Sequence, residues 1–179
     1  MIREKSTLRE VAFEICTALE KIGVTAVLTG GSAATVYAPQ AYQSRDLDFI
    51  VQFHKESARP GETLKKLGYS LRGQYYEHVS NSLTLDFPRG PLMIGSDYVQ
   101  NWDTLRQGNR LLHILSPTDC CRDRLAGFLF WNDFSALGQA LAVARIKKSQ
   151  IKMKTIRSWC IHEDAQEKFE EFARRLAET

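Results

Sequence analysis

The sequence changes its pattern at Ser116, and this change restricts the fold more than any other feature of the 179-residue chain. Before Ser116, short apolar runs of strand length alternate with helical segments, whereas the pattern after it is helical to the end. A serine, a proline and an acid within 116–119 are typical of a helix start. We therefore expect an α+β fold, with a small mixed sheet flanked by helices in residues 1–115. A C-terminal helical segment, 116–179, would pack on it as an appendage or within one continuous domain.

Apolar spacing and turn residues predict where the individual helices and strands lie. Helices are expected over 7–21, 33–38, 60–67, 117–131, 133–146, 149–161 and 164–177. Strands are expected over 24–28, 46–53, 69–71, 75–79, 83–87, 103–107 and 111–115. The last two would form a hairpin around Gly108 and Asn109 or remain two short strands.

The composition is that of an ordinary globular protein, with 44% apolar and 25% charged residues. The net charge of +3 is too small to demand a nucleic-acid partner. The four cysteines form no Cys-x-x-Cys pair, which argues against a zinc site and a disulfide framework. The chain start lacks the apolar stretch of a signal peptide, and no apolar run approaches the length of a membrane span. We therefore expect a cytoplasmic protein that makes no contact with a membrane.

Asp46 and Asp48 open the clearest strand of the sequence, 46–53. Side chains two residues apart in a strand point to the same face, so the two carboxylates project side by side while Leu47 and Phe49 enter the core. Two carboxylates this close repel each other unless a cation lies between them, and their oxygens suit Mg²⁺ or Mn²⁺. The alternative is a solvated outer face of an edge strand.

A glycine turn, Gly30-Gly31-Ser32, follows the first predicted strand directly. Glycines let the backbone approach a ligand closely. A helix that begins here would point its free N–H groups and the positive end of its dipole at that ligand. The Ser32 hydroxyl adds a donor, so the turn suits a phosphate. An ordinary loop is the alternative.

Asp86 is the third acid of interest, on the strand predicted over 83–87. It should face opposite to Leu85 and Phe87. If its strand lies next to 46–53, Asp86 would join the same site as a metal ligand or as a general base. Otherwise it is a surface residue at the end of a strand.

These features together resemble the polymerase-β-like nucleotidyltransferase superfamily. The shared pattern is a strand, a Gly-Gly-Ser turn, a short helix, a strand that opens Asp-x-Asp, and a later strand with an aspartate. Thirteen residues separate Ser32 from Asp46, a spacing that such proteins use. The resemblance is to the minimal bacterial branch, including proteins related to AbiEii-type toxins, and it covers roughly residues 20–145. In the helical segment it rests on 116–119, 123–126 and 131–133.

The resemblance implies a metal-dependent enzyme that transfers a nucleoside monophosphate from a nucleoside triphosphate to an acceptor hydroxyl. It implies that the phosphates are held by Gly30, Gly31 and Ser32, and that Mg²⁺ or Mn²⁺ is bound by Asp46, Asp48 and Asp86. Some relatives carry a lysine early in the helix after the catalytic module, and here the nearby cations are Arg122 and Arg124. Arg45 would contact a phosphate or balance the aspartates.

The acceptor and the partners are less defined by the sequence. Between Arg145 and His162 there are six Lys or Arg residues and no acid. This stretch is either an amphipathic helix with a solvated basic face or a patch for tRNA or another RNA. The resemblance also allows a catalytically inactive nucleotide- or partner-binding module, and a toxin with a cognate antitoxin. A homodimer stays open.

Overall fold

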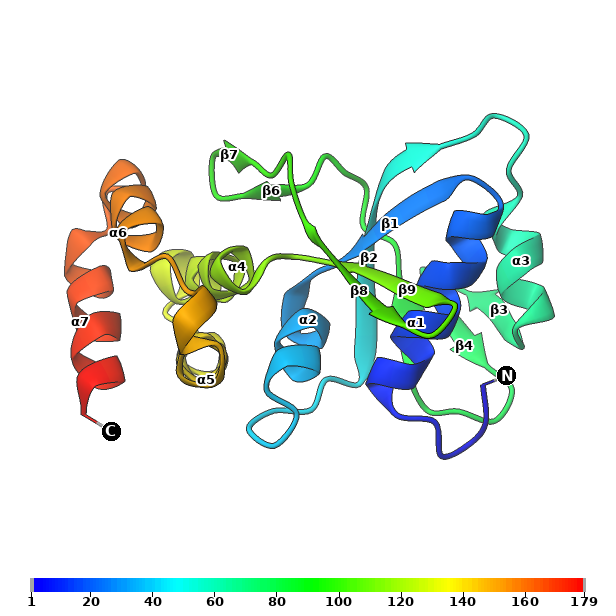
Figure 1. Cartoon of the computed structure of the whole chain (residues 1–179), viewed down its shortest axis with the longest axis horizontal. Helices are drawn as coiled ribbons and strands as arrows, with labels where there is room; N and C mark the ends of the chain where they lie inside the picture. Colours follow the sequence, from blue (N-terminus) through cyan, green and yellow to red (C-terminus); the bar gives the residue numbers. More distant parts are fainter. Residues whose placement is uncertain (1, 179) are drawn as a thin grey trace.

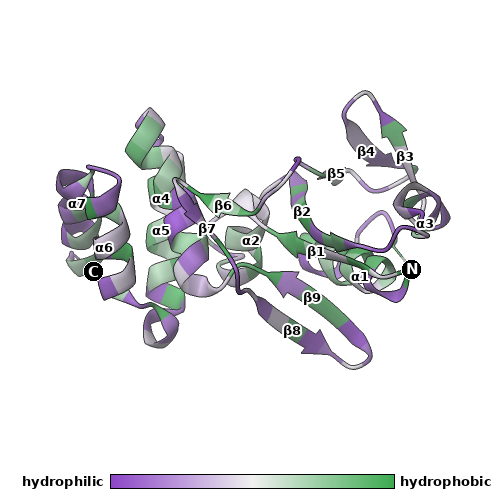
Figure 2. Cartoon of the chain, turned by 90° about the horizontal axis from the view of Figure 1, so that it is seen from above, coloured by the Kyte–Doolittle hydropathy of each residue, from purple (hydrophilic) through white to green (hydrophobic). Residues whose placement is uncertain are grey.

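The structure is a computed structural model that describes residues 2–178, and it has the mixed α and β architecture expected from the sequence. A sheet flanked by helices occupies one end of the molecule, and the C-terminal helices occupy the other (Figure 1). The helices are α1 (Leu8–Lys21), α2 (Gly30–Tyr37), α3 (Pro60–Lys66), α4 (Pro117–Trp131), α5 (Phe134–Ile146), α6 (Met153–His162) and α7 (Gln166–Ala177). Seen from above, α7 lies far from the sheet and is mostly hydrophilic (Figure 2).

The main sheet is mixed, with parallel and antiparallel pairs. Its strands are β1 (Val24–Leu28), β2 (Asp46–His54), β3 (Tyr69–Arg72), β4 (Tyr75–His78), β5 (Thr84–Asp86), β8 (Asp103–Gln107) and β9 (Arg110–Ile114). Within the described residues their order is β3-β4-β5-β2-β1-β9-β8. Strand β2 is antiparallel to β1 and parallel to β5, and β1 is parallel to β9. The apolar run of β1 is therefore central and almost entirely buried.

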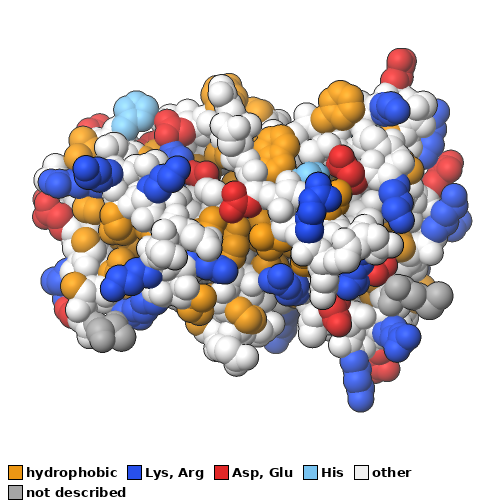
Figure 3. Space-filling view, in the orientation of Figure 1, with side chains coloured by type: hydrophobic (Ala, Val, Ile, Leu, Met, Phe, Trp, Pro, Cys, Tyr) orange, Lys and Arg blue, Asp and Glu red, His pale blue; other side chains and the backbone are white. Residues whose placement is uncertain are grey.

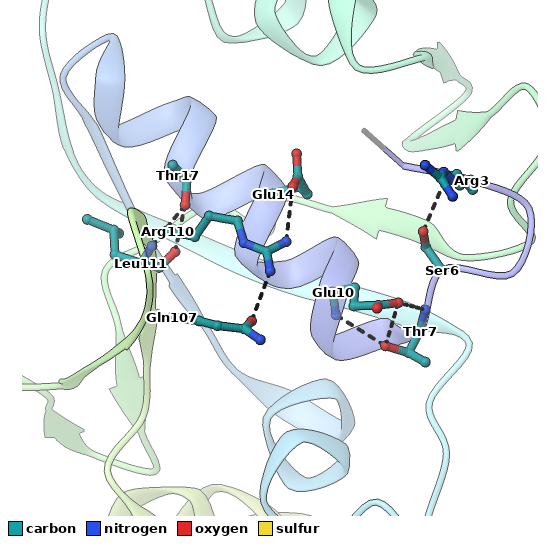
Figure 4. A network of polar contacts seen from close by, with 9 residues as sticks. All are labelled: Arg3, Ser6, Thr7, Glu10, Glu14, Thr17, Gln107, Arg110 and Leu111. Atoms are coloured by element: carbon teal, nitrogen blue, oxygen red, sulfur yellow. Dashed lines mark hydrogen bonds and ion pairs between the residues drawn. The ribbon is translucent and has the colours of Figure 1, made fainter.

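Helix α1 packs on β1 and β9 and is fixed by polar contacts at its N-terminus and at Thr17 (Figure 4). At its N-terminus, Thr7 N donates to Glu10 Oε2 at 2.8 Å, and Glu10 N donates to Thr7 Oγ1 at 3.3 Å. Further along, Thr17 Oγ1 donates to Leu111 O at 3.1 Å and accepts from Leu111 N at 2.9 Å. The helix is thus tied to β9, the strand that leads into the C-terminal segment.

Most expected elements are confirmed, and the differences lie at boundaries. Helix α2 begins at Gly30 rather than at residue 33, so the glycine turn is itself the first helical turn. Helix α6 begins at Met153, because Lys148–Gln150 form a 3₁₀ turn instead of continuing a helix from residue 149. The start of α5 has Asp133 as its N-cap, which accepts from the N–H groups of the second and third helical residues.

A short hairpin that the sequence analysis did not predict lies between β5 and β8 along the chain and contacts the helical segment. Its strands are β6 (Met93–Ile94) and β7 (Asp97–Tyr98). It lies beside α4, as the view from above shows (Figure 2). In its turn, Ser96 donates from both N and Oγ to Glu163 Oε1, each at 2.7 Å. Two-residue strands carry no periodic pattern, which is why local sequence reasoning missed them.

Arg122 of α4 ties this hairpin to the helices. Its side chain is only 8% exposed and forms ion pairs with Asp97 of β7 and Asp119 of α4, the latter at 2.9 Å. Its guanidinium lies 5.2 Å from the ring centroid of Trp159 on α6. The buried Arg122 guanidinium therefore links the hairpin strand β7, helix α4 and helix α6.

The four cysteines are free and buried. Burial raises the pKa of the Cys16, Cys121 and Cys160 thiols to about 12, so they stay protonated at neutral pH. Among the described residues, no helix combines the length and the apolar character that a membrane crossing requires.

Candidate active site

The three carboxylates selected from the sequence lie together on two neighbouring strands. Strands β2 and β5 run parallel, and their register pairs Asp48 with Asp86. Asp46 lies two residues before Asp48 and shares its face, while Leu47 between them is fully buried. All three aspartates are partly exposed. The strand of Asp86 therefore lies next to the strand of Asp46 and Asp48. This is the arrangement under which the sequence analysis expected Asp86 to join the same site.

The turn between β1 and α2 holds the backbone of β2 at Asp48. Thr29 N donates to Asp48 O at 2.9 Å, and Asp48 N donates to the Ser32 hydroxyl at 3.2 Å. The same hydroxyl donates to Thr29 O at 2.7 Å. Ser32 is fully buried, so its hydroxyl holds the turn to the strand rather than facing a ligand, in contrast to the sequence-based expectation.

Position 30 requires a glycine for two reasons. Its φ of +65° lies in the left-handed region, which other residues rarely adopt. A Cβ at this position would also overlap Oδ2 of Asp48. The close approach places the Asp48 carboxylate directly against the first turn of α2.

Replacing Gly30 by alanine is expected to lower the free energy of unfolding by about 2 kcal/mol, of which the left-handed backbone accounts for about 1. The remainder comes from the overlap with Asp48. Urea unfolding would measure it. Gly108→Ala is the matched control, because Gly108 has a φ of +58° but nothing within 4 Å of the added Cβ. If Gly30→Ala and Gly108→Ala lost the same free energy of unfolding, the Asp48 carboxylate would add nothing to the cost of a side chain at position 30.

The pKa of Asp48 reflects the crowding of the carboxylates. It is raised to about 6, first by burial and then by the nearby charge of Asp46, while Arg124 opposes the rise and Asp86 adds to it. A buried carboxyl group surrounded by other carboxylates favours a proton or a bound cation. The site therefore has the electrostatic character of a cation site.

Of the two arginines predicted for the site, the structure brings in Arg124. It projects from α4, is 22% exposed, pairs with Asp123 at 2.7 Å and acts on the charge of Asp48. Arg45 is exposed, and its side chain makes no hydrogen bond or ion pair among residues 2–178. Its backbone O accepts from Thr84 N at 3.2 Å and so helps to join β2 to β5.

Two residues that the sequence analysis did not select border Gly31. A Cβ at position 31 would lie 3.1 Å from Tyr42 Cε1 and 3.5 Å from Gln139 Oε1. Gln139 is buried on α5, and within residues 2–178 its Oε1 has no hydrogen-bond partner. Buried amides are normally paired, so this one has spare bonding capacity beside the glycine turn. Gln139 is the one polar side chain in the apolar run 136–144, and this sequence signal could have identified it as a candidate.

The donor set fits a hard divalent cation by its chemistry. Asp46 Oδ1 accepts from Ser44 Oγ at 2.6 Å, which orients that carboxylate. As the side chains lie, no group of three or more Asp, Glu, His or Cys residues within 2–178 is arranged to hold a metal. Sharing one ion would therefore require rotation of carboxylates about their side-chain torsions, which partly exposed aspartates allow.

The basic stretch 145–162 does not form a single helical face. Its cations are divided among the end of α5, the 3₁₀ turn and α6, and Arg145 donates to Arg175 O. Lys152 and Lys154 line surface cavities that also contain aspartates. On the face drawn in Figure 3, Lys and Arg side chains lie on both halves with acidic side chains among them. An RNA patch there stays a prediction.

The sequence matches no model of a known protein family and no curated protein. The functional assignment therefore depends on the residues and contacts of this chain.

Proposed function

We propose that the protein is a metal-dependent nucleotidyltransferase, which transfers a nucleoside monophosphate from a nucleoside triphosphate to an acceptor hydroxyl. One observation carries the proposal: Asp46, Asp48 and Asp86 lie together on two parallel strands, and Asp48 lies against the first turn of α2. Carboxylates that suit a divalent cation and N–H groups that suit phosphates thus meet at one place.

The phosphates would lie at the glycine turn. Ala33 N donates the first bond of the helix, to Thr29 O at 3.0 Å, so the N–H groups of Gly30, Gly31 and Ser32 precede the bonding pattern of α2. The positive end of the helix dipole favours an anion there. The Arg124 guanidinium near Asp48 is a further donor to the same phosphates.

The carboxylates would hold Mg²⁺ or Mn²⁺, which would polarise the phosphoryl oxygens and offset charge on the attacking and leaving oxygens. Asp46 and Asp48 are the ligands we assign. Asp86, opposite Asp48, either completes that set or takes the proton of the acceptor hydroxyl as the new O–P bond forms. Pyrophosphate leaves when the bond to the α-phosphorus breaks. Positioning and charge stabilisation would supply most of the acceleration.

A module that binds nucleotide without catalysis is the competing function. It would gain support if Asp86 lay far from the other two acids. The observed pairing of Asp86 with Asp48 favours the enzyme instead. Among acceptors, the exposed cations of 145–162 favour an RNA, tRNA included.

The test is incubation of the purified protein with Mg²⁺ and each α-³²P-labelled nucleoside triphosphate in turn, in the presence of total cellular RNA and protein extract. We expect label in one fraction, which identifies the acceptor class. Asp46→Ala/Asp48→Ala should abolish it, because the metal loses its ligands. Glu62→Ala/Glu77→Ala, which removes two exposed acids outside the site, is the matched control and should keep it.

Label that persists in Asp46→Ala/Asp48→Ala would refute the assigned site. Absence of label with all four nucleotides, alongside Mg²⁺-dependent nucleotide binding, would favour the binding module.

A further inference from the structure

A cavity of about 500 Å³ lies between the β6–β7 hairpin and helix α4. Its size is within the range of small-molecule sites. Its walls come from the hairpin, from α4 and from Glu163 at the end of α6. The residues that line it are Met93, Ile94, Gly95, Asp123, Arg124, Ala126, Gly127, Phe130, Trp131 and Glu163.

The cavity has a small residue in its lining and fixed walls. Ala126 of α4 lines it and has no large side chain to fill it. The hairpin wall is held by the Ser96–Glu163 hydrogen bonds and by the Asp97–Arg122 ion pair. The cavity is therefore formed before any ligand arrives, and binding there needs little rearrangement.

The lining of the cavity includes a charged pair. Asp123 and Arg124 of α4 line it, and α4 packs against α2, the helix that begins with the glycine turn. A ligand with an anionic part at Asp48 and the glycine turn could therefore extend into this cavity past Arg124.

Part of the cavity lining is aromatic. Phe130 and Trp131 form its wall, with ring centroids 5.6 Å apart in an edge-to-face arrangement. The Trp131 side chain is 76% exposed, although large aromatic residues are usually well buried. An exposed ring at the edge of a cavity is suited to stacking on a planar heterocycle.

We propose that this cavity binds the base of the nucleoside triphosphate, which stacks on Trp131 while its phosphates reach the glycine turn. This inference rests on the proposed function, because the carboxylate site supplies the phosphate end of the ligand. The ligand class is a planar nucleobase carried on a charged phosphate chain.

The test separates the base from the phosphates. Affinity for each of the four nucleoside triphosphates and for inorganic triphosphate would be measured with Mg²⁺ by calorimetry. Trp131→Ala removes the stacking surface, and Ala126→Phe fills the cavity. Both should weaken the preferred nucleoside triphosphate about tenfold and leave inorganic triphosphate within twofold. Trp131→Phe keeps a ring and should restore most of the affinity. Phe53→Ala, an exposed aromatic residue outside the cavity, should change neither ligand.

The outcomes distinguish the two proposals. Equal affinity in wild type, Trp131→Ala and Ala126→Phe would overturn the base site and leave the proposed function standing. Equal weakening of inorganic triphosphate would also overturn it, because the effect would then not come from the base. Wild-type protein that binds neither ligand would overturn the proposed function and this inference together. Trp131 is exposed, so its variants should keep the wild-type melting temperature, which confirms that they fold.

Discussion

Asp48→Asn is expected to raise the free energy of unfolding of the metal-free protein by about 2–3 kcal/mol at pH 8. The native protein buries a carboxylate beside Asp46 and Asp86, and its pKa is about 6 instead of the ordinary 3.8. At pH 8 the wild type must keep this group charged in an environment that favours the neutral form. Asparagine has a similar shape and no charge, so it removes that cost.

The sign of the pH dependence follows from the raised pKa. Above pH 6, Asp48 is ionised in both states and the full cost applies. As the pH falls from about 6 towards 4, the native state takes up a proton before the unfolded state does, so the wild type regains stability. The gain from Asp48→Asn should therefore shrink across this range and vanish below it.

Urea unfolding of both proteins at several pH values between 3.5 and 8 would check this expectation. Glu77→Gln, at an exposed position on β4, is the control and should show no comparable gain at any pH. A destabilised Asp48→Asn at pH 8 would show that the carboxylate is held by favourable contacts instead of merely tolerated. Added Mg²⁺ should stabilise the wild type and not the variant, because the ion compensates the charge that asparagine lacks.

Arg122→Met is expected to lower the free energy of unfolding by about 3 kcal/mol. The substitution keeps much of the side-chain length but leaves Asp119 and Asp97 without their cation and removes the contact over Trp159. Both acids retain some exposure, which limits the loss to the lower part of the range for a broken buried pair. Thermal and urea unfolding would measure the effect.

Arg174→Met provides the control for Arg122→Met. Arg174 also pairs with two acids, Glu171 and Glu178, but its side chain is 57% exposed and the pairs lie in solvent. Little change is expected there. If the two variants were equally stable, burial would add nothing to the Arg122 ion pairs, and the hairpin would depend on Ser96 and Glu163 for its attachment.

The sequence predicted the parts of the fold that are encoded locally. Capping residues and apolar spacing placed α1, α4 and α5 within a residue or two, and alternation placed β2. The pairing of Asp48 with Asp86 was only a condition in the sequence analysis, because the register between two strands depends on the whole sheet. The two-residue strands of the hairpin lacked any periodic signal.

In the candidate site, too, some residues could be selected from local sequence and others depend on tertiary packing. Asp46 and Asp48 could be selected because strand alternation fixes their common face. Arg122 and Arg124 were both candidates on sequence grounds, and only the docking of α4 separates them, because Arg122 pairs with Asp97 and Asp119 while Arg124 acts on the charge of Asp48. The Ser32 hydroxyl was assigned to a ligand because its bond to Asp48 depends on a contact between two elements that the local sequence does not reveal. Gln139 went unselected because its burial beside Gly31 comes from the packing of α5.

The buried cysteines give this protein a built-in set of reporters of local opening. Cys16 lies in α1, Cys120 and Cys121 in α4, and Cys160 in α6, so the thiols sample the sheet region and two layers of the helical segment. Each is protected by burial and by a raised pKa, so an alkylating reagent can react only when its region opens. The labelling rate of each thiol is therefore a measure of how often its own part of the molecule fluctuates out of the native packing.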